Sequence, residues 1–108
     1  MLFKIGEQYE KQEFYLQRIN TLLLGDLEYE VYRHLSEMRI ELLGVLIKSV
    51  MLYYNADILS AVQYHLVEEI CADELLLKEK IQEVNNVEIT LDKTNLWIMS
   101  KTFSLNKI

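Results

Sequence analysis

The stretch DLEYEVYRHLSEMRIELLGVLIKSVMLYYN, residues 26–55, contains the longest apolar run of the chain. Asp26 follows Gly25 at a natural helix N-cap position, where a carboxylate accepts an otherwise unpaired backbone N–H. Glu28 and Glu30 add negative charge near the positive end of a helix dipole. Apolar residues then recur every three or four positions, a spacing that predicts one long amphipathic helix; they are Val31, Leu35, Met38, Leu42 and Val45.

The second half of this predicted helix, Leu42 to Tyr54, is apolar on nearly every side. A helix of that kind is normally buried. Unbroken, the helix would be about 45 Å long, which exceeds the diameter of a compact domain of this size. The sequence therefore leaves two alternatives, a bend at Gly44 or a projecting helix that pairs with a second copy of the chain.

The segment before it, residues 7–24, also follows a helical spacing. Gly25 is suited to the left-handed backbone that often ends a helix. Since Gly25 and Asp26 alone separate the two predicted helices, we expect them to form an antiparallel helical hairpin. Residues Met1 to Ile5 are either a short strand or the start of the first helix.

A third helix is predicted from Ala56 toward Val84. Asp73 interrupts its apolar stripe, and no Gly or Pro marks a break there. The interpretation of one continuous helix is preferred, with a second helix capped by Asp73 as the alternative. The stripe is formed by Leu59, Val62, Leu66, Ile70, Leu77, Ile81 and Val84.

The periodicity changes after residue 86. Val87, Ile89 and Leu91 alternate with polar residues, which indicates a half-buried strand. The sequence from Asp92 to Asn95 has the chemistry of a turn, and residues 96–100 form the returning strand. The predicted fold is α+β and mainly α: a single domain over residues 1–108, with three long helices in an antiparallel bundle followed by a C-terminal β-hairpin.

Composition limits the classes of protein that this chain can belong to. Its 108 residues match one domain, and its 51% apolar content excludes a disordered chain. The one cysteine, Cys71, cannot form an internal disulfide, which favours a reducing compartment. The first residues lack the apolar core of a signal peptide, and the longest apolar run is too short for a transmembrane helix. We expect a cytoplasmic protein.

The formal net charge of −6 is concentrated in residues 56–86, which contain seven acidic and two basic residues. An acidic protein is repelled by nucleic-acid phosphates and anionic membranes. A protein partner with a basic surface is the expected alternative. The simplest interpretation of the acidic segment, however, is a helix face in contact with water.

No set of residues indicates an enzyme. The chain lacks the Glu-x-x-His pairs of carboxylate-bridged metal bundles, a glycine-rich phosphate loop and a Gly-x-Ser-x-Gly element. Acidic neighbours make Cys71 a poor nucleophile, and His34 and His65 form only ordinary helix-surface pairs with glutamates. No catalytic, cofactor or metal site is therefore predicted.

The function expected from the sequence is protein binding by a small acidic regulator, of the inhibitor, immunity or adaptor type, acting as a homodimer. One alternative is a winged-helix-like DNA-binding regulator, with residues 73–84 as recognition helix and residues 87–101 as wing; its weak basic footprint argues against it. Another is a structural subunit of a larger assembly. The predicted interface residues are Glu68, Glu69, Asp73, Glu74, Glu79, Glu83, Tyr53 and Tyr54.

Overall fold

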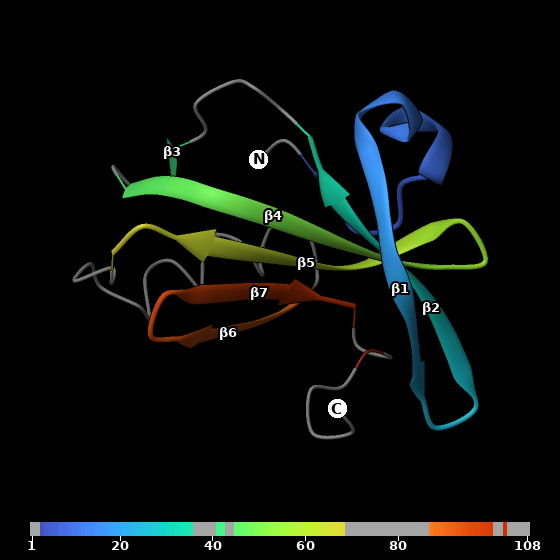
Figure 1. The fold of residues 1–108 in the computed structure, drawn as a ribbon. Helices are drawn as coiled ribbons and strands as arrows, with labels where there is room; N and C mark the ends of the chain where they lie inside the picture. The colour runs from blue at the N-terminus through green and yellow to red at the C-terminus, as the bar shows by residue number, and fades with distance from the viewer. Residues whose placement is uncertain (1–2, 36–40, 43–44, 69–86, 101–102, 104–108) are drawn as a thin grey trace.

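The protein is an antiparallel β-sheet protein in the computed structural model, which describes residues 3–35, 41–42, 45–68, 87–100 and 103. Seven strands form the sheet in the order β1-β2-β4-β5-β7-β6, and β3 pairs with β4 off this path (Figure 1). They are β1 (Leu16–Leu24), β2 (Leu27–His34), β3 (Glu41–Leu42), β4 (Val45–Asn55), β5 (Ile58–Leu66), β6 (Glu88–Asp92) and β7 (Asn95–Met99). The described helices are two 3₁₀ turns, η1 (Tyr9–Lys11) and η2 (Glu13–Tyr15).

The predicted three-helix bundle is wrong. Residues 7–24 form the two 3₁₀ turns and β1, and residues 26–55 contain β2, β3 and β4 in place of one long helix. Residues 58–66, expected to begin the third helix, form β5. The possible breaks at Gly44 and Asp73, and the remainder of the third helix over residues 69–86, lie outside the described residues. The N-terminal helices that a winged-helix protein needs are therefore strands here.

The dipeptide Gly25-Asp26 connects β1 to β2 as a tight hairpin turn, not as the end of one helix and the cap of the next. Leu24 pairs with Leu27 across it, and Gly25 has φ of 62°. A glycine with positive φ at the first loop position suits the two-residue turns that join twisted strands. The same two residues thus satisfy helix-end and hairpin rules, and the pairing of the flanking strands decides between them.

Buried and more exposed residues alternate along β2, which explains why this segment forms a strand and not a helix. Tyr29 and Val31 are buried, at 1% and 3% exposure, while their neighbours Glu28 and Glu30 lie on the other side of the strand. This is the period of two that a half-buried strand requires. The helical spacing of apolar residues that begins at Val31 leaves this alternation over residues 28–31 out of account.

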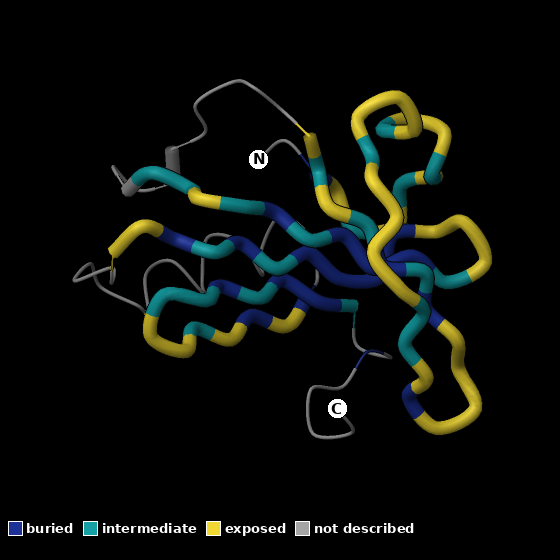
Figure 2. The backbone as a smooth tube through the Cα atoms, viewed as in Figure 1, coloured by how far each residue is buried: buried dark blue, intermediate teal, exposed yellow. Residues whose placement is uncertain are grey.

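β4 is the central strand and is apolar on both sides. Val50, Leu52 and Tyr54 belong to one core cluster, while Tyr53 belongs to a second cluster and Met51 packs against it. A continuous apolar run is expected for a strand that is covered on both faces. Figure 2 shows burial concentrated along β4, β5 and β7 and exposure along the β1–β2 hairpin.

The C-terminal hairpin is confirmed. β6 and β7 pair antiparallel from Glu88 with Met99 to Asp92 with Asn95, across the predicted turn. Residues 3–5, for which a strand or a helix start was predicted, belong to neither element, although Phe3 is buried at 2% exposure. The following residues hydrogen-bond to β5: the Gly6 N–H donates to the Leu59 carbonyl at 2.8 Å.

The turn between β4 and β5 contains a strained residue. Asn55 pairs with Ile58 across a two-residue loop, and both loop residues, Ala56 and Asp57, have positive φ, 48° and 66°. This is the backbone of a type I′ turn, which favours Asn and Gly. Alanine has no side-chain polar group to compensate for the left-handed conformation.

We expect Ala56→Asn to raise the free energy of unfolding by about 0.5–1 kcal/mol, because Asn tolerates the left-handed backbone of this turn. The matched variant Ala56→Val should lower it by about 1 kcal/mol or more, since a β-branched residue is disfavoured at positive φ. Urea unfolding of the three proteins measures both changes. Equal stability of the two variants would contradict the assigned turn geometry.

Candidate protein-docking surface

Large apolar side chains are exposed mainly on one part of the molecule, the β1–β2 hairpin and the residues flanking it. Of the eight large apolar residues that are exposed among the described ones, six lie between residues 14 and 35. Leu23 is 68% exposed and Phe14 is 92% exposed. Leu23 and Leu27 lie near the turn of the hairpin, and Tyr15 and Leu35 lie at its base. Exposed apolar side chains gathered on one element often mark a binding site. The six residues, here called the hairpin patch, are Phe14, Tyr15, Ile19, Leu23, Leu27 and Leu35.

In the part of the chain that the structure describes, β1 forms one edge of the sheet and pairs with β2 alone. Its nine residues contain one charged side chain, Arg18, and its burial pattern is mostly exposed. Natural edge strands are usually protected by charges, prolines, bulges or short length. β1 has one bulge, between Arg18 and Asn20, so the remaining part, residues 20–24, is an unprotected edge.

The two sides of β1 differ beyond the bulge. Leu24 is buried in the second core cluster and Leu22 packs against that cluster. Leu23, which alternates with them, is exposed and stands opposite Glu28 of β2. The core thus holds one side of the strand in place, and the other side presents apolar surface to solvent.

A local polar network neutralises Arg18. Its Nη2 atom lies 2.9 Å from a carboxylate oxygen of Glu30 and donates to the Thr21 hydroxyl, also at 2.9 Å. The pair is solvent-exposed, with 62% of the Arg18 side chain accessible, so it contributes little to stability. Its effect is to hold the guanidinium along β1 instead of projecting it from the edge.

The base of the hairpin is fixed by the 3₁₀ segment. The Leu35 N–H donates to the Tyr15 carbonyl at 2.6 Å, and the Tyr15 ring stacks on His34 with 5.7 Å between ring centroids. His34 Nε2 lies 3.2 Å from Gln12 Oε1. Burial lowers the pKa of His34 below its ordinary value of 6.5, which favours the uncharged imidazole in this aromatic environment.

Next to this base, three buried polar atoms have no hydrogen-bond partner among the described residues. They are Glu7 Oε1, His34 Nδ1 and the Tyr54 hydroxyl oxygen. Burial raises the pKa of the Glu7 carboxyl above 4.5 and also raises the pKa of the Tyr54 hydroxyl, which the Glu7 charge raises further. Each unpaired buried group costs stability.

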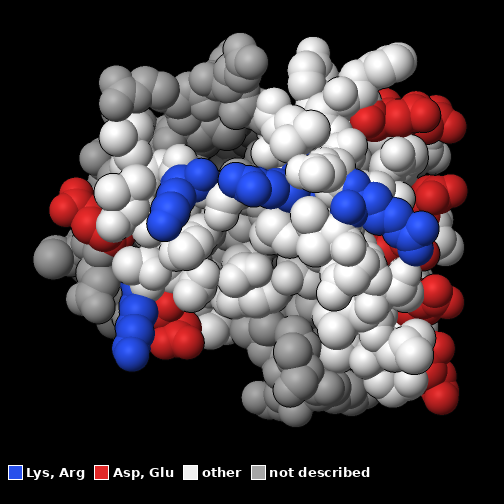
Figure 3. Space-filling model, in the orientation of Figure 1, with Lys and Arg blue, Asp and Glu red and all other residues white. Residues whose placement is uncertain are grey.

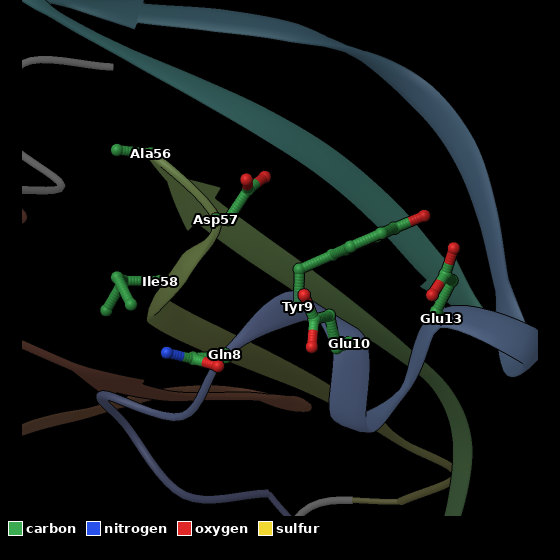
Figure 4. Close-up of a pocket in the computed structure, with 7 residues that line it drawn as sticks. All are labelled: Gln8, Tyr9, Glu10, Glu13, Ala56, Asp57 and Ile58. Carbon is green, nitrogen blue, oxygen red and sulfur yellow. The ribbon is translucent and has the colours of Figure 1, made fainter.

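A separate hollow of about 420 Å³ lies between the η1–η2 segment and the β4–β5 turn (Figure 4). Three carboxylates, Glu10, Glu13 and Asp57, are among its lining residues. The Tyr9 N–H donates to the Asp57 carbonyl at 2.7 Å and joins the two segments. Within the described ranges, no group of three or more His, Cys, Asp or Glu side chains is placed to hold a metal ion.

Lys and Arg side chains form a row across the side of the molecule that Figure 3 draws. β4, β2 and β1 carry one Lys or Arg each, Lys48, Arg33 and Arg18. Arg18 pairs with Tyr32 and therefore lies on the opposite face of the sheet from Arg33. Arg33 aligns through strand pairing with Met51, Gln63 and Trp97. Gln63 accepts from the Tyr53 hydroxyl at 3.2 Å and donates to Asn95 at 3.1 Å. The Gln63 side chain therefore forms its hydrogen bonds with neighbouring strands of the sheet.

The structure separates the predicted interface residues. Glu68 is exposed and lies just after β5. Tyr53 and Tyr54 are both buried, at 8% and 1% exposure, in core clusters on opposite faces of β4, so they do not form one exposed interface. Glu69, Asp73, Glu74, Glu79 and Glu83 lie outside the described residues, and their role in binding stays a prediction.

Sequence reasoning missed the hairpin patch. The helix predicted over residues 7–24 places Ile19 and Leu23, four positions apart, on one apolar stripe, yet they are 47% and 68% exposed on an edge strand. The signal that identifies them is Gly25-Asp26 between two segments rich in apolar residues, which is typical of a hairpin. Ile19 and Leu23 are expected to be buried if residues 7–24 form a helix, and they are exposed because these residues form an edge strand.

Known protein families, characterised proteins and solved structures were compared with the chain, and none matches it. Among the described residues, no helix has the length and apolar character needed to cross a membrane.

We expect Tyr54→Phe to raise the free energy of unfolding by about 1 kcal/mol, because it removes a buried hydroxyl that lacks a partner. Tyr53→Phe is the matched control: it removes a hydroxyl that donates to Gln63, and should lower the free energy of unfolding by about 1 kcal/mol. Denaturant unfolding measures both, and a loss of stability in Tyr54→Phe would contradict the unpaired state of its hydroxyl.

The raised pKa of Glu7 predicts how the stability of the protein depends on pH. Because its pKa is higher in the folded protein than the ordinary 4.5, the folded state binds the proton more tightly than the unfolded chain. The Glu7 contribution to stability therefore falls as pH rises from about 4 toward 7, and is fully unfavourable once pH exceeds the folded pKa. The variant Glu7→Gln has no such loss, so its stability relative to the native protein should increase over that range.

Unfolding curves at several pH values measure this difference. His34 has the opposite dependence, since its lowered pKa means that stability is lost as pH falls below 6.5. Both proteins contain His34, and its contribution largely cancels in the comparison. A constant stability difference between Glu7→Gln and the native protein from about pH 4 to pH 7 would contradict the prediction.

Proposed function

We propose that this protein acts by binding another protein chain, and that the bound chain adds a strand to the edge of β1. The observation that carries the proposal is the combination of an edge strand with one charge in nine residues and the hairpin patch beside it. Strand addition is a common mode of recognition, in which backbone hydrogen bonds supply affinity and alternate side chains supply specificity.

The architecture of β1 supports this function. In an edge strand, alternate residues direct their N–H and C=O groups away from the neighbouring strand, where an added strand can pair with them. The pairing of β1 with β2 from Leu16 to Leu24 fixes its extended backbone before any partner arrives. Preorganisation of this kind lowers the entropy cost of binding.

The side chains around the edge also fit a protein partner. Exposed aromatic and aliphatic groups, including Tyr15 at 55% and Ile19 at 47% exposure, supply the apolar centre of an interface. Glu28 lies beside Leu23 and supplies polar surface at the border. The earlier expectation of a homodimer was based on an overlong helix, and that basis is removed; protein binding itself is now supported by different residues.

A photo-cross-linking amino acid at Leu23 tests this function in cells that naturally make the protein. We expect covalent adducts with a protein chain at this position, and few or none with the same group at Val67, an exposed apolar residue outside the hairpin patch at 59% exposure. Mass spectrometry identifies the adduct and the peptide joined to β1.

The identified partner is then tested in purified form against the variants Ile19→Lys and Val67→Lys. Ile19→Lys should weaken binding roughly tenfold or more, because it places a charge in the apolar centre of the interface, while Val67→Lys should bind as the native protein does. Equal adduct formation at both positions, or equal affinity of both variants, would show that β1 is not the docking element.

A further inference from the structure

We propose that the strand added to β1 comes from a second copy of this chain, so that two β1 strands pair antiparallel about a two-fold axis at Thr21. The inference rests on the proposed function of the β1 edge. It specifies the partner as an identical chain and the register as Thr21 opposite Thr21. The two sheets then become one continuous sheet through the dimer.

The side-chain pattern of β1 is complementary to itself. Thr21 and Leu23 share one side of the strand, and Ile19 is the bulged residue just before them. An antiparallel partner centred on Thr21 places Ile19 of each copy opposite Leu23 of the other. Residues directly opposite one another on one side of an antiparallel pair contact closely. The most exposed apolar groups of the edge, Leu23 at 68% and Ile19 at 47%, thus cover each other.

The charges of β1 do not oppose this pairing. Arg18 is its one charged residue, and in this register Arg18 stands opposite Leu24 of the other copy. The two Arg18 side chains are then separated by six positions along the strands, about 20 Å. Each guanidinium is also held by Glu30 of its own chain at 2.9 Å, so neither carries an uncompensated charge into the interface.

The acidic residues of β2 in one copy are far enough from those in the other copy to avoid strong repulsion. In the dimer, β2 of one copy is three strand spacings from β2 of the other, about 14 Å. This distance exceeds the Debye length of about 8 Å at physiological ionic strength. Repulsion involving Glu28 and Glu30 across the dimer is therefore largely screened.

The other edge of the sheet does not offer the same symmetry. β6 has five residues, of which Glu88 and Asp92 are acidic and exposed. Antiparallel pairing of two β6 strands about their centre would place Glu88 of one copy opposite Asp92 of the other, and like charges directly opposite are destabilising. Charge is a usual protection of an edge; β6 carries it at both ends, whereas residues 20–24 of β1, a stretch of the same length, carry none.

Solution mass by sedimentation and light scattering tests the proposal directly. We expect the native chain, of 12.8 kDa, to form a dimer of twice that mass, and the double variant Ile19→Lys/Leu23→Lys to associate on the order of 100-fold more weakly, since it places lysines opposite lysines. Val67→Lys, which adds a charge elsewhere on the surface, should dimerise as the native chain does. Circular dichroism and thermal unfolding confirm that each variant is folded.

A second measurement tests the register without depending on a destabilised variant. In a background with Cys71→Ser, Thr21→Cys should form a disulfide between copies under mild oxidation, because opposite residues of an antiparallel pair lie within disulfide reach. Thr90→Cys on the β6 edge, in the same Cys71→Ser background, is the control and should form no disulfide between copies under the same conditions, although it still pairs through β1.

The outcomes separate the two proposals. A native chain that is monomeric at all concentrations, or a dimer that the double variant retains, overturns the self-pairing. If cross-links at Leu23 then lead to a different protein, strand addition at β1 stands and the identity of the partner changes. If cross-links at Leu23 are absent and the native chain is a monomer, both proposals are overturned.

Discussion

The structure depends on the need to cover both faces of β4. This strand runs through the middle of the sheet and sends Val50 and Leu52 to one core cluster and Tyr53 to the other. A strand that is apolar on both sides is stable only when both sides are removed from water. The N-terminal segment supplies part of the cover on one face through Phe3, and Phe103 supplies part on the other.

The cover has consequences for the rest of the chain. The N-terminal residues that reach across the sheet bring Glu7 and Gln12 close to His34 and the buried tyrosines, and three polar atoms there have no partner among the described residues. The same segment ends at η2, which fixes the base of the β1–β2 hairpin. One face of that hairpin is covered up to its turn, through Leu24 and Tyr29 in the second core cluster, while other side chains of the hairpin remain exposed (Figure 2).

The two strands of the β1–β2 hairpin differ in how far they are covered. β2 lies between β1 and β4, and its Tyr29 and Val31 are buried. Among the described residues β1 pairs with β2 alone; its Leu22 and Leu24 pack in the second core cluster, and Leu16, before the bulge, packs against the first. Beyond the bulge, residues 20–24 of β1 carry no charge, and an uncharged edge is a hazard for aggregation unless another strand covers it. That hazard supports the proposed addition of a strand to β1.

The sequence by itself determined the C-terminal hairpin, where strict alternation over Val87, Ile89 and Leu91 and an unambiguous turn leave no competing helix. It also determined that β4 is central, because a continuous apolar run is buried in either kind of element. Only the tertiary structure decided between helix and strand for residues 16–34 and 45–66. Gly25-Asp26 can end a helix or turn a hairpin, and long-range pairing between strands, which no local propensity contains, selects the hairpin. The exposed edge follows from that choice, since the position of a strand within a sheet depends on its partners and not on its own residues.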